Sequence, residues 1–422
     1  MDGKPLSKAF WRVWSAVGVS SLGDGLAFAA LPLLAESLSD RGIWVTLTFA
    51  ASRLPWLLFG LVAGAWVDSR PPRLTMIQMD GVRFLAMFVL AVGVLAHVAS
   101  IPMVLAVAFA IGMADCAHIP AAAAYLPSIV DGGELDRANS YLSSAELGGE
   151  QFAGPTVGAA LFAWAPWVPF VGDSASFFGS GLLVRSVSSG PDARTYTKPL
   201  SLRPDITAGW TWFRKNRDLW VLTILVSVAA AATGMTNSAL VLYGKRHLGL
   251  SNWQFGLFIS VPALGALVGS TVAFRIWRRV GTRALMAGSL ASLAVALFIC
   301  SQTKSPYVAA AALTVDGFLP PLVNTCIRTL RQQGVPHELL GRVASVGRLM
   351  AIGAAFAGAA VAGLIADLTT IPTVYGIAAG ILAVSLLLAG PRLRKVRLEL
   401  VNSRTGVLST GGDDAMGPKP KT

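Results

Sequence analysis

Charged side chains inside long apolar stretches are the strongest candidates for chemistry in this sequence. If those stretches lie in a bilayer, each charge near the centre costs about 2.5 to 3.5 kcal/mol, so these residues are functional groups or buried partners of one another. The first half of the chain offers Asp24, Arg53, Asp80, Arg83, Asp115, His118, Glu146, Glu150 and Asp173, and the second half offers Asp316, Arg328 and Arg348. Acids therefore predominate in the first half.

Asp24 is the first candidate for a proton site. It lies about 12 residues into the first apolar stretch, or roughly 18 Å along a helix, which is close to the middle of a membrane. A carboxyl group there, between Gly23 and Gly25, could exchange a proton for a cationic substrate. The alternative is a helix-packing pair with Arg53, for which the partner role is the simpler interpretation.

Glu146, Glu150 and Asp173 are further candidates. The two glutamates are four residues apart and share one face of a helix, which suggests a second proton site. Glu146 is also close enough to the end of its stretch to be solvated instead. Asp173 begins another stretch near its outer end, where a structural role and a functional role are equally compatible with the pattern.

Two other pairs of polar residues have simpler interpretations. Asp80 and Arg83 lie at the start of their stretch and are predicted to form a surface pair. Asp115 and His118 are three residues apart and could form a second polar site, although a single histidine in a membrane is more often a packing residue.

The composition indicates which elements must position these side chains. Of 422 residues, 54% are hydrophobic and only 13% are charged, too few to cover a soluble core. About 20 apolar residues are needed to cross the hydrocarbon as a helix, the one single-segment structure that satisfies its own backbone there. Twelve stretches meet this length: 12–38, 43–67, 75–97, 101–125, 139–164, 167–187, 219–243, 253–276, 283–302, 306–329, 342–367 and 371–390. We predict an all-α integral membrane protein.

The basic residues predict the orientation of the chain. The net charge is +12, and most of the basic side chains lie in alternate loops. The other loops hold only Arg41, Lys245, Arg246 and Lys304. Because lysine and arginine mark cytoplasmic loops, both termini are predicted to be cytoplasmic, in a multi-pass protein of the cell membrane. No basic stripe interleaved with aromatic residues occurs, so nucleic acid is not an expected partner.

The twelve stretches divide into two halves that resemble each other. An offset of 204 to 205 residues aligns Arg73 with Arg278 and Phe152-Ala153-Gly154 with Phe356-Ala357-Gly358. We predict two six-helix pseudo-symmetric lobes, the N-terminal one over 1–187 and the C-terminal one over 219–397. Residues 188–218 would be a cytoplasmic linker with an amphipathic helix, and residues 398–422 a disordered cytoplasmic tail.

Motifs for other chemistry are missing from the sequence. It contains no nucleotide-binding G-x-x-x-x-G-K-[ST], no H-E-x-x-H and no G-x-S-x-G. Cys116, Cys300 and Cys326 all lie in apolar stretches without metal-ligand spacing. We therefore predict no cofactor, no metal and no enzymatic activity.

The segment from Gly64 to Arg73 resembles the loop motif of the major facilitator superfamily, with departures at Trp66 and at the two prolines before Arg73. The resemblance implies that Gly64, Asp68, Arg70 and Arg73 form a cytoplasmic gate. A second copy, from Gly269 to Arg283, has Ala273 in place of the acid, which implies a weaker gate there.

The segment Gly149 to Ala159 is similar to an element of the exporter branches of that superfamily, in which Gly154, Pro155 and Gly158 allow the helix to bend or to pack closely. Gly172-Asp173 and Leu340-Gly341-Arg342 look like the branch of macrolide-efflux proteins and the enterobactin exporter.

These resemblances imply the major facilitator fold and secondary transport. We predict a monomeric, proton-coupled antiporter that exports a small organic molecule such as a drug, antibiotic, siderophore or other secondary metabolite. Asp24, Arg53, Glu146, Glu150 and Asp173 would couple protons to substrate. A proton-coupled importer of a small solute is the nearest alternative, and a membrane-embedded enzyme or receptor is the alternative of another class.

Overall fold

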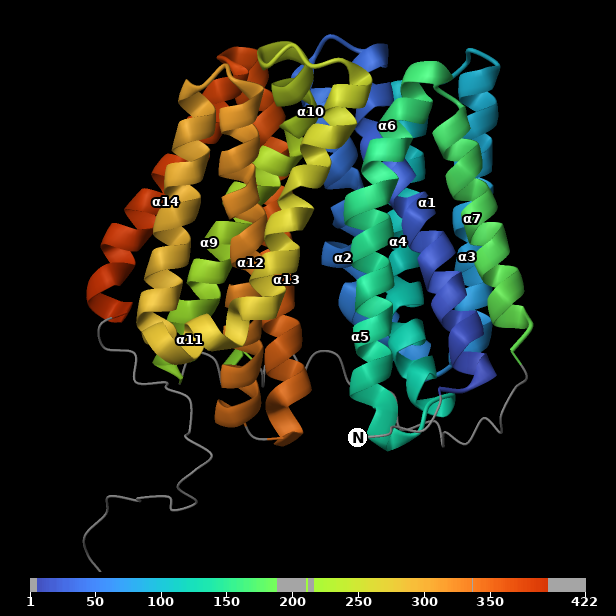
Figure 1. Cartoon of the computed structure of the whole chain (residues 1–422), viewed down its shortest axis with the longest axis horizontal. Coiled ribbons are helices and arrows are strands. Elements are labelled where there is room, and N and C mark those ends of the chain that lie inside the picture. The colour runs from blue at the N-terminus through green and yellow to red at the C-terminus, as the bar shows by residue number, and fades with distance from the viewer. Residues whose placement is uncertain (1–5, 188–209, 212–215, 336, 394–422) are drawn as a thin grey trace, which may run out of the picture.

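The computed structural model describes residues 6–187, 210–211, 216–335 and 337–393, which are helical almost throughout (Figure 1). The first half contains α1 (Lys8–Leu38), α2 (Gly42–Asp68), α3 (Pro72–Leu95), α4 (Ile101–Tyr125), α5 (Leu135–Glu146), a π-helix η3 (Leu147–Ala153), α6 (Gly154–Trp164) and α7 (Val168–Arg185). The second half contains α9 (Arg217–Ser238), α10 (Leu240–Leu242), a π-helix η4 (Tyr243–His247), α11 (Asn252–Gln302), α12 (Pro306–Gly334), α13 (His337–Leu368) and α14 (Ile371–Leu393).

Each of the twelve predicted stretches is helical. Nine helices within the described residues are long and apolar enough to cross a membrane, and α11 includes two of the predicted stretches. Gly281 separates those two, because its φ of 76° is incompatible with a continuous α-helix. The remaining two stretches are the α5–η3–α6 path and α7, so the predicted all-α membrane fold is confirmed.

The helices form two bundles side by side (Figure 1). Helices α1 to α7 pack on one another, drawn from blue to green, and α9 to α14 form the second bundle, drawn from yellow-green to red. The predicted linker lies mostly outside the described residues. Among its described residues, Trp210 packs its ring edge-on against Trp220, with centroids 5.1 Å apart. The predicted tail lies entirely outside them.

Glycines bring α1 against η3 and α6. A methyl group added at Gly25 would lie 2.6 Å from the carbonyl oxygen of Gly149 and 2.8 Å from Cα of Gly154, and one added at Gly158 would lie 2.6 Å from Cα of Leu26. No larger residue fits such backbone contacts. A π-helix ends at Ala153, immediately before Gly154 and Pro155 of α6.

The second bundle repeats this packing. A methyl group at Gly234 of α9 would lie 2.8 Å from Cα of Ala355 of α13, and Gly358 contacts Ala231 in the same way. Likewise Gly112 of α4 packs on α2, and Gly317 of α12, 205 residues later, packs on the first part of α11. These equivalent contacts agree with the predicted internal duplication.

The two bundles meet along α2 with α13 and along η3 and α6 with the first part of α11. The second contact is polar. The Thr156 and Ser260 hydroxyl oxygens are 2.8 Å apart, and Ser260 also donates to the carbonyl oxygen of Phe152 at 3.0 Å. Gly256 lies against α6, where a methyl group would be 2.6 Å from Cβ of Ala159. Close packing therefore continues across the interface.

The lobes are joined at the face where α1 ends and α2 begins, which is opposite the end of α7 and the start of α9 (Figure 1). Arg246 of the second lobe forms an ion pair with Glu36 at 3.2 Å and donates to the carbonyl oxygens of Ser39 and Asp40. The carboxylate of Asp367 accepts hydrogen bonds from the first amides of α2, Gly42 at 2.6 Å and Ile43 at 3.2 Å. An acid at a helix N-terminus is favoured by the helix dipole.

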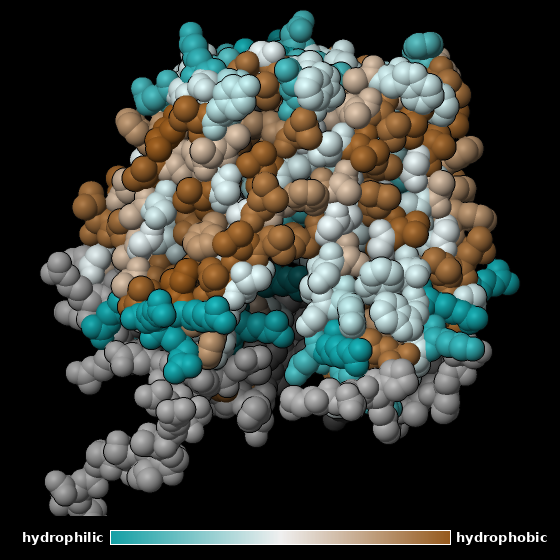
Figure 2. Space-filling view, viewed as in Figure 1, coloured by the Kyte–Doolittle hydropathy of each residue, from teal (hydrophilic) through white to brown (hydrophobic). Residues whose placement is uncertain are grey.

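The face where α7 ends and α9 begins, called the linker face below, is open between the lobes (Figure 2). Figure 2 shows the surface hollowed between the two halves on that side, with hydrophilic residues in its depth. A brown, hydrophobic belt surrounds the rest of the visible surface. The lobes are thus closed at one end and separated at the other.

We expect the opposite-face contacts to hold this end closed. Replacing both Arg246 and Asp367 by alanine removes the ion pair and the cap of α2, a loss of about 1 to 2 kcal/mol, which changes the ratio of closed to open molecules by roughly 5- to 30-fold. Spin labels at exposed Trp164 and Tyr307, one in each lobe, would report this as a larger population of long distances.

Lys304→Ala is the matched control, because it removes an exposed cation at the same face that makes no lobe-to-lobe contact among the described residues. Buried Cys116, Cys300 and Cys326 are replaced by serine in every sample so that only the introduced cysteines are labelled. An unchanged distance distribution in the double variant would show that the contacts do not hold the face closed.

Candidate functional site

Arg83 of α3 lies at the centre of a buried charge cluster in the first lobe. Its guanidinium forms an ion pair with Asp115 of α4 and a longer one, 3.6 Å, with Asp80. It also lies 5.2 Å from the centre of the Phe177 ring of α7. Only 3% of Arg83 is exposed. A cation buried to this extent requires countercharges from the protein itself.

Asp80 connects the same cluster to α4 and α7. Its Oδ2 accepts a hydrogen bond from Ser180 at 2.9 Å, and its Oδ1 lies 3.2 Å from Nε2 of His118. The prediction of a surface pair at Asp80 and Arg83 is wrong, because α3 begins at Pro72 and both residues are covered by α4 and α7. The predicted second polar site at Asp115 and His118 is part of this single network.

Asp24 and Asp173 complete the cluster from α1 and α7. A methyl group at Gly23 would lie 2.6 Å from Oδ1 of Asp173, so the two helices touch here. Ser20 donates to Asp24 at 3.4 Å, whereas Oδ2 of fully buried Asp173 has no hydrogen-bond partner within the described residues.

Arg83 is the cation that acts most strongly on Asp24. No ion pair joins Asp24 to Arg53, both of which the structure describes, so the predicted pair between them is wrong. We call Arg83 and the four acids Asp24, Asp80, Asp115 and Asp173 the aspartate cluster.

Arg53, Glu146 and Glu150 lie beside this cluster and are exposed. Arg53 is placed over the ring of Phe49 at 5.3 Å and acts electrostatically on Glu150. Glu150 also acts on Asp24, and Glu146 interacts with Glu150. Glu146 ends α5 and Glu150 lies inside the π-helix that follows, so their spacing is not that of the regular α-helix assumed from the sequence.

The predicted gate motif is only partly described. The surroundings of Gly64 and the side chain of Asp68 lie outside the described part of the structure. Arg70 stacks on Trp66 with its guanidinium carbon 4.2 Å from the ring centre. Arg73 donates to the carbonyl oxygens of Val184 and Arg185 and so ties the start of α3 to the end of α7. These contacts lie within the first lobe.

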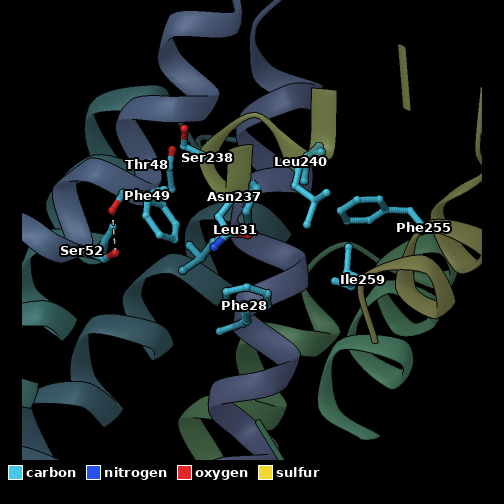
Figure 3. A pocket seen from close by; sticks show the side chains of 14 residues that line it. Phe28, Leu31, Thr48, Phe49, Ser52, Asn237, Ser238, Leu240, Phe255 and Ile259 are labelled. Carbon is cyan, nitrogen blue, oxygen red and sulfur yellow. Dashed lines mark hydrogen bonds between the residues drawn. The ribbon is translucent and has the colours of Figure 1, made fainter. Parts of the chain in front are cut away.

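An apolar pocket lies between the lobes on the closed side of Asp24 (Figure 3). Phe28 and Leu31 of α1 and Phe49 of α2 face Phe255 and Ile259 of α11 across it. Its polar lining side chains are Thr48, Ser52, Asn237 and Ser238, and its volume is about 80 Å³. Phe28 is one helical turn from Asp24, so an apolar group in this pocket would lie next to the charge cluster.

The cluster and the pocket together can bind a charge next to an apolar surface. Four carboxylates around one guanidinium leave an excess of negative charge that a proton or another cation can neutralise. A charge cluster within one lobe, next to a pocket between two lobes that are closed at one end and open at the other, is the arrangement expected of a secondary transporter.

The comparison of families agrees with this class. Residues 13–351 match the Major Facilitator Superfamily, and the chain belongs to this family of transporters, which are not enzymes. It is 27% identical over 401 residues to the multidrug efflux pump Tap of Mycolicibacterium fortuitum, covering 89% of this chain and 94% of that protein. The predicted resemblance to efflux proteins of this superfamily is confirmed.

Solved structures confirm the fold. The nucleoside transporter NupG superposes with a TM-score of 0.75 at 12% identity, covering 92% of this chain and all of that one. A bacterial homologue of the iron transporter ferroportin, in an inward-facing state, gives a TM-score of 0.72 at 17% identity, covering 93% of this chain and 99% of that one.

Arg83 is the residue whose importance the sequence obscured. Its spacing from Asp80 indicates a local pair on one helix, whereas its main partner, Asp115, lies on another helix. The available signal was the number of acids in the apolar stretches of the first half, because such acids need a cation from the protein itself.

We expect Arg83→Met to destabilise the protein by about 3 to 5 kcal/mol, because it leaves buried Asp80 and half-buried Asp115 without their cation. Thermal unfolding in detergent measures the loss, and Arg70→Met, which removes an exposed arginine from the ring of Trp66, is the matched control. Adding Asp115→Asn to Arg83→Met should restore part of the stability. Equal unfolding temperatures for Arg83→Met and Arg70→Met would contradict a central role for Arg83.

Proposed function

We propose that this protein is a proton-coupled antiporter that exports a small organic molecule from the cytoplasm by alternating access. The observation that carries the proposal is the aspartate cluster, which places more acids than cations beside an apolar pocket between the lobes. The likeness to an efflux pump, at modest identity over nearly the whole chain, supports the direction.

The proton site is proposed at Asp24, with Asp173 and Glu150 as its neighbours. Asp24 is partly exposed whereas Asp173 is fully buried, so Asp24 is the member of this pair that water in the open hollow can reach. Adding a proton there reduces the negative charge around Arg83 and changes the balance between the two open states. Arg53 and Glu146, at the exposed edge, modulate Glu150.

The pocket and the hollow serve as the substrate path. Aromatic and aliphatic side chains of both lobes contact an apolar molecule without fixing its shape, which suits a transporter of varied substrates. Because both lobes of one chain form this path, the protein is proposed to act as a monomer.

The membrane orientation is also proposed. The hollow opens on the linker face, and the basic loops predicted from the sequence lie on that same face. By the positive-inside rule this face is cytoplasmic, the membrane is the cell membrane, and the state is open to the cytoplasm. Export then requires the contacts of Arg246 and Asp367 to break once the substrate has bound.

Inverted vesicles with an acidic interior test the proposal. They are supplied with lipophilic cations and macrolide-like compounds, and uptake is followed as the gradient is imposed. One charge moved across 100 mV supplies about 2.3 kcal/mol, so we expect Asp24→Asn to reduce gradient-driven accumulation by up to roughly 50-fold. Exchange of labelled for unlabelled substrate without a gradient should persist in this variant.

Asp136→Asn is the control, since it removes an exposed acid of the same lobe outside the cluster. Gradient-driven uptake that survives in Asp24→Asn would place the proton site elsewhere. Loss of substrate from the inverted vesicles when their interior is acidified would instead favour the importer, which runs protons and substrate in the same direction.

A further inference from the structure

A second pocket lies inside the C-terminal lobe, between α9, the part of α11 after Gly281, and α12. Its volume is about 180 Å³. Asp316 of α12 is the one charged residue among those that line it, and the polar lining also includes Thr233, Ser289 and Asn324. The other lining side chains are apolar, among them Leu225, Leu290 and Leu293. The pocket is thus an apolar chamber with one acid.

Asp316 has no countercharge of its own. It lies about 15 Å from the start of α12, near the middle of the membrane. No ion pair or hydrogen bond to its carboxylate is formed by any residue that the structure describes. A carboxylate in that position is costly unless a partner is supplied.

Ser289 provides independent support for a ligand in this pocket. It lines the pocket from α11, only 7% of it is exposed, and its hydroxyl oxygen has no hydrogen-bond partner among the described residues. A buried hydroxyl without a partner is unusual, because leaving it unsatisfied costs about 1 to 3 kcal/mol. Two polar groups from different helices therefore face the same cavity unpaired.

Comparison with the equivalent helices of the first lobe shows that the pocket lacks a cation. Its three walls, α9, the later part of α11 and α12, correspond to α1, α3 and α4 of the first lobe. In the first lobe this space holds the aspartate cluster, filled by Arg83. At the offset of 204 to 205 residues Arg83 aligns with Ala287 or Gly288, and α11 has no charged residue between Leu285 and Gln302, so Arg83 has no charged counterpart there.

We propose that a substrate supplies this missing cation, so that the pocket binds the charged end of an organic cation against Asp316. This assignment rests on the proposed function and adds the substrate class to it. An inorganic cation such as Ca²⁺ requires six or more oxygen ligands, more than these few polar side chains provide, whereas an alkylammonium group needs one countercharge and apolar walls. Exposed Pro320 and Asn324 mark the entrance.

The division of charge between the lobes follows from this assignment. Protons bind at the aspartate cluster of the first lobe, and the cationic end of the substrate binds in the second. The apolar part of the same molecule extends away from Asp316 along Leu225 and Leu293. The two ligands then need not compete for one carboxylate.

Equilibrium binding to the full chain in lipid nanodiscs, without any gradient, tests the assignment. The probes are labelled benzyltrimethylammonium and its uncharged isostere neopentylbenzene, which have the same shape. We expect Asp316→Asn to weaken cation binding by at least roughly tenfold, because a buried charge loses its partner, and to leave binding of the isostere unchanged. Asp316→Glu should keep cation binding.

A second variant keeps the assignment testable if Asp316→Asn does not fold. Leu290→Arg places a guanidinium in the pocket wall, and we expect it to exclude the cation by pairing with Asp316. Asp136→Asn is the surface control. Undiminished cation binding in both pocket variants, or an equal loss of both probes in Asp316→Asn, overturns the assignment, as does a wild type that does not bind the cation.

In the same assay, Asp24→Asn distinguishes cation binding in the first lobe from cation binding in the second lobe. Loss of cation binding in this variant but not in Asp316→Asn would place the substrate charge at the aspartate cluster and overturn the assignment. A wild type that binds the cation at Asp316 but fails to exchange it for protons in vesicles would contradict the proposed function alone.

Discussion

The cost of placing charge in lipid governs this molecule. An ion within the membrane must find its countercharge in the protein, because lipid offers none. In the first lobe Arg83 meets this requirement by pairing with Asp115 and Asp80, which joins α3 to α4, while Ser180 of α7 bonds to Asp80. Asp24 on α1 lies within the field of the same guanidinium. One buried cation thus contacts α4 and α7 directly and acts on α1 through its charge.

The same physics made the helices predictable. Lipid leaves the backbone no partner but itself, so each apolar stretch of about 20 residues had to be a helix, and all twelve are. Departures from regular helix were less accessible. Pro155 indicated that the helix could bend or pack closely, but not that a π-helix would form over Leu147–Ala153, where Gly25 packs on Gly149. Such packing is set by two helices at once and leaves little signal in either.

The depth of a candidate site residue in the membrane can be predicted from its position in an apolar stretch. Asp24 was placed near the midplane by counting residues, and the structure puts it at the edge of the charge cluster. Counting cannot show which neighbour a helix faces. For this reason Arg83 was assigned to the surface and Arg53 to Asp24, whereas Arg83 is buried and Arg53 lies over Phe49. The role of an isolated acid such as Asp316 is harder still to predict, because it is inferred from the absence of an ion pair or hydrogen bond among the described residues, which only the structure shows.

The contacts within a lobe are stronger than those between the lobes. A rocking motion requires this difference, because each lobe must move as a unit while the interface opens. Within the first lobe, the ion pairs of Arg83 are buried and costly to break, so that lobe moves as a unit. Between the lobes at the closed face, Arg246 and Glu36 are both partly exposed, and water can replace their contact at little cost. The Thr156 and Ser260 hydroxyls at the interface are likewise neutral and can exchange partners. Buried charge is confined to single lobes, so opening the interface separates no buried ion pair among the described residues.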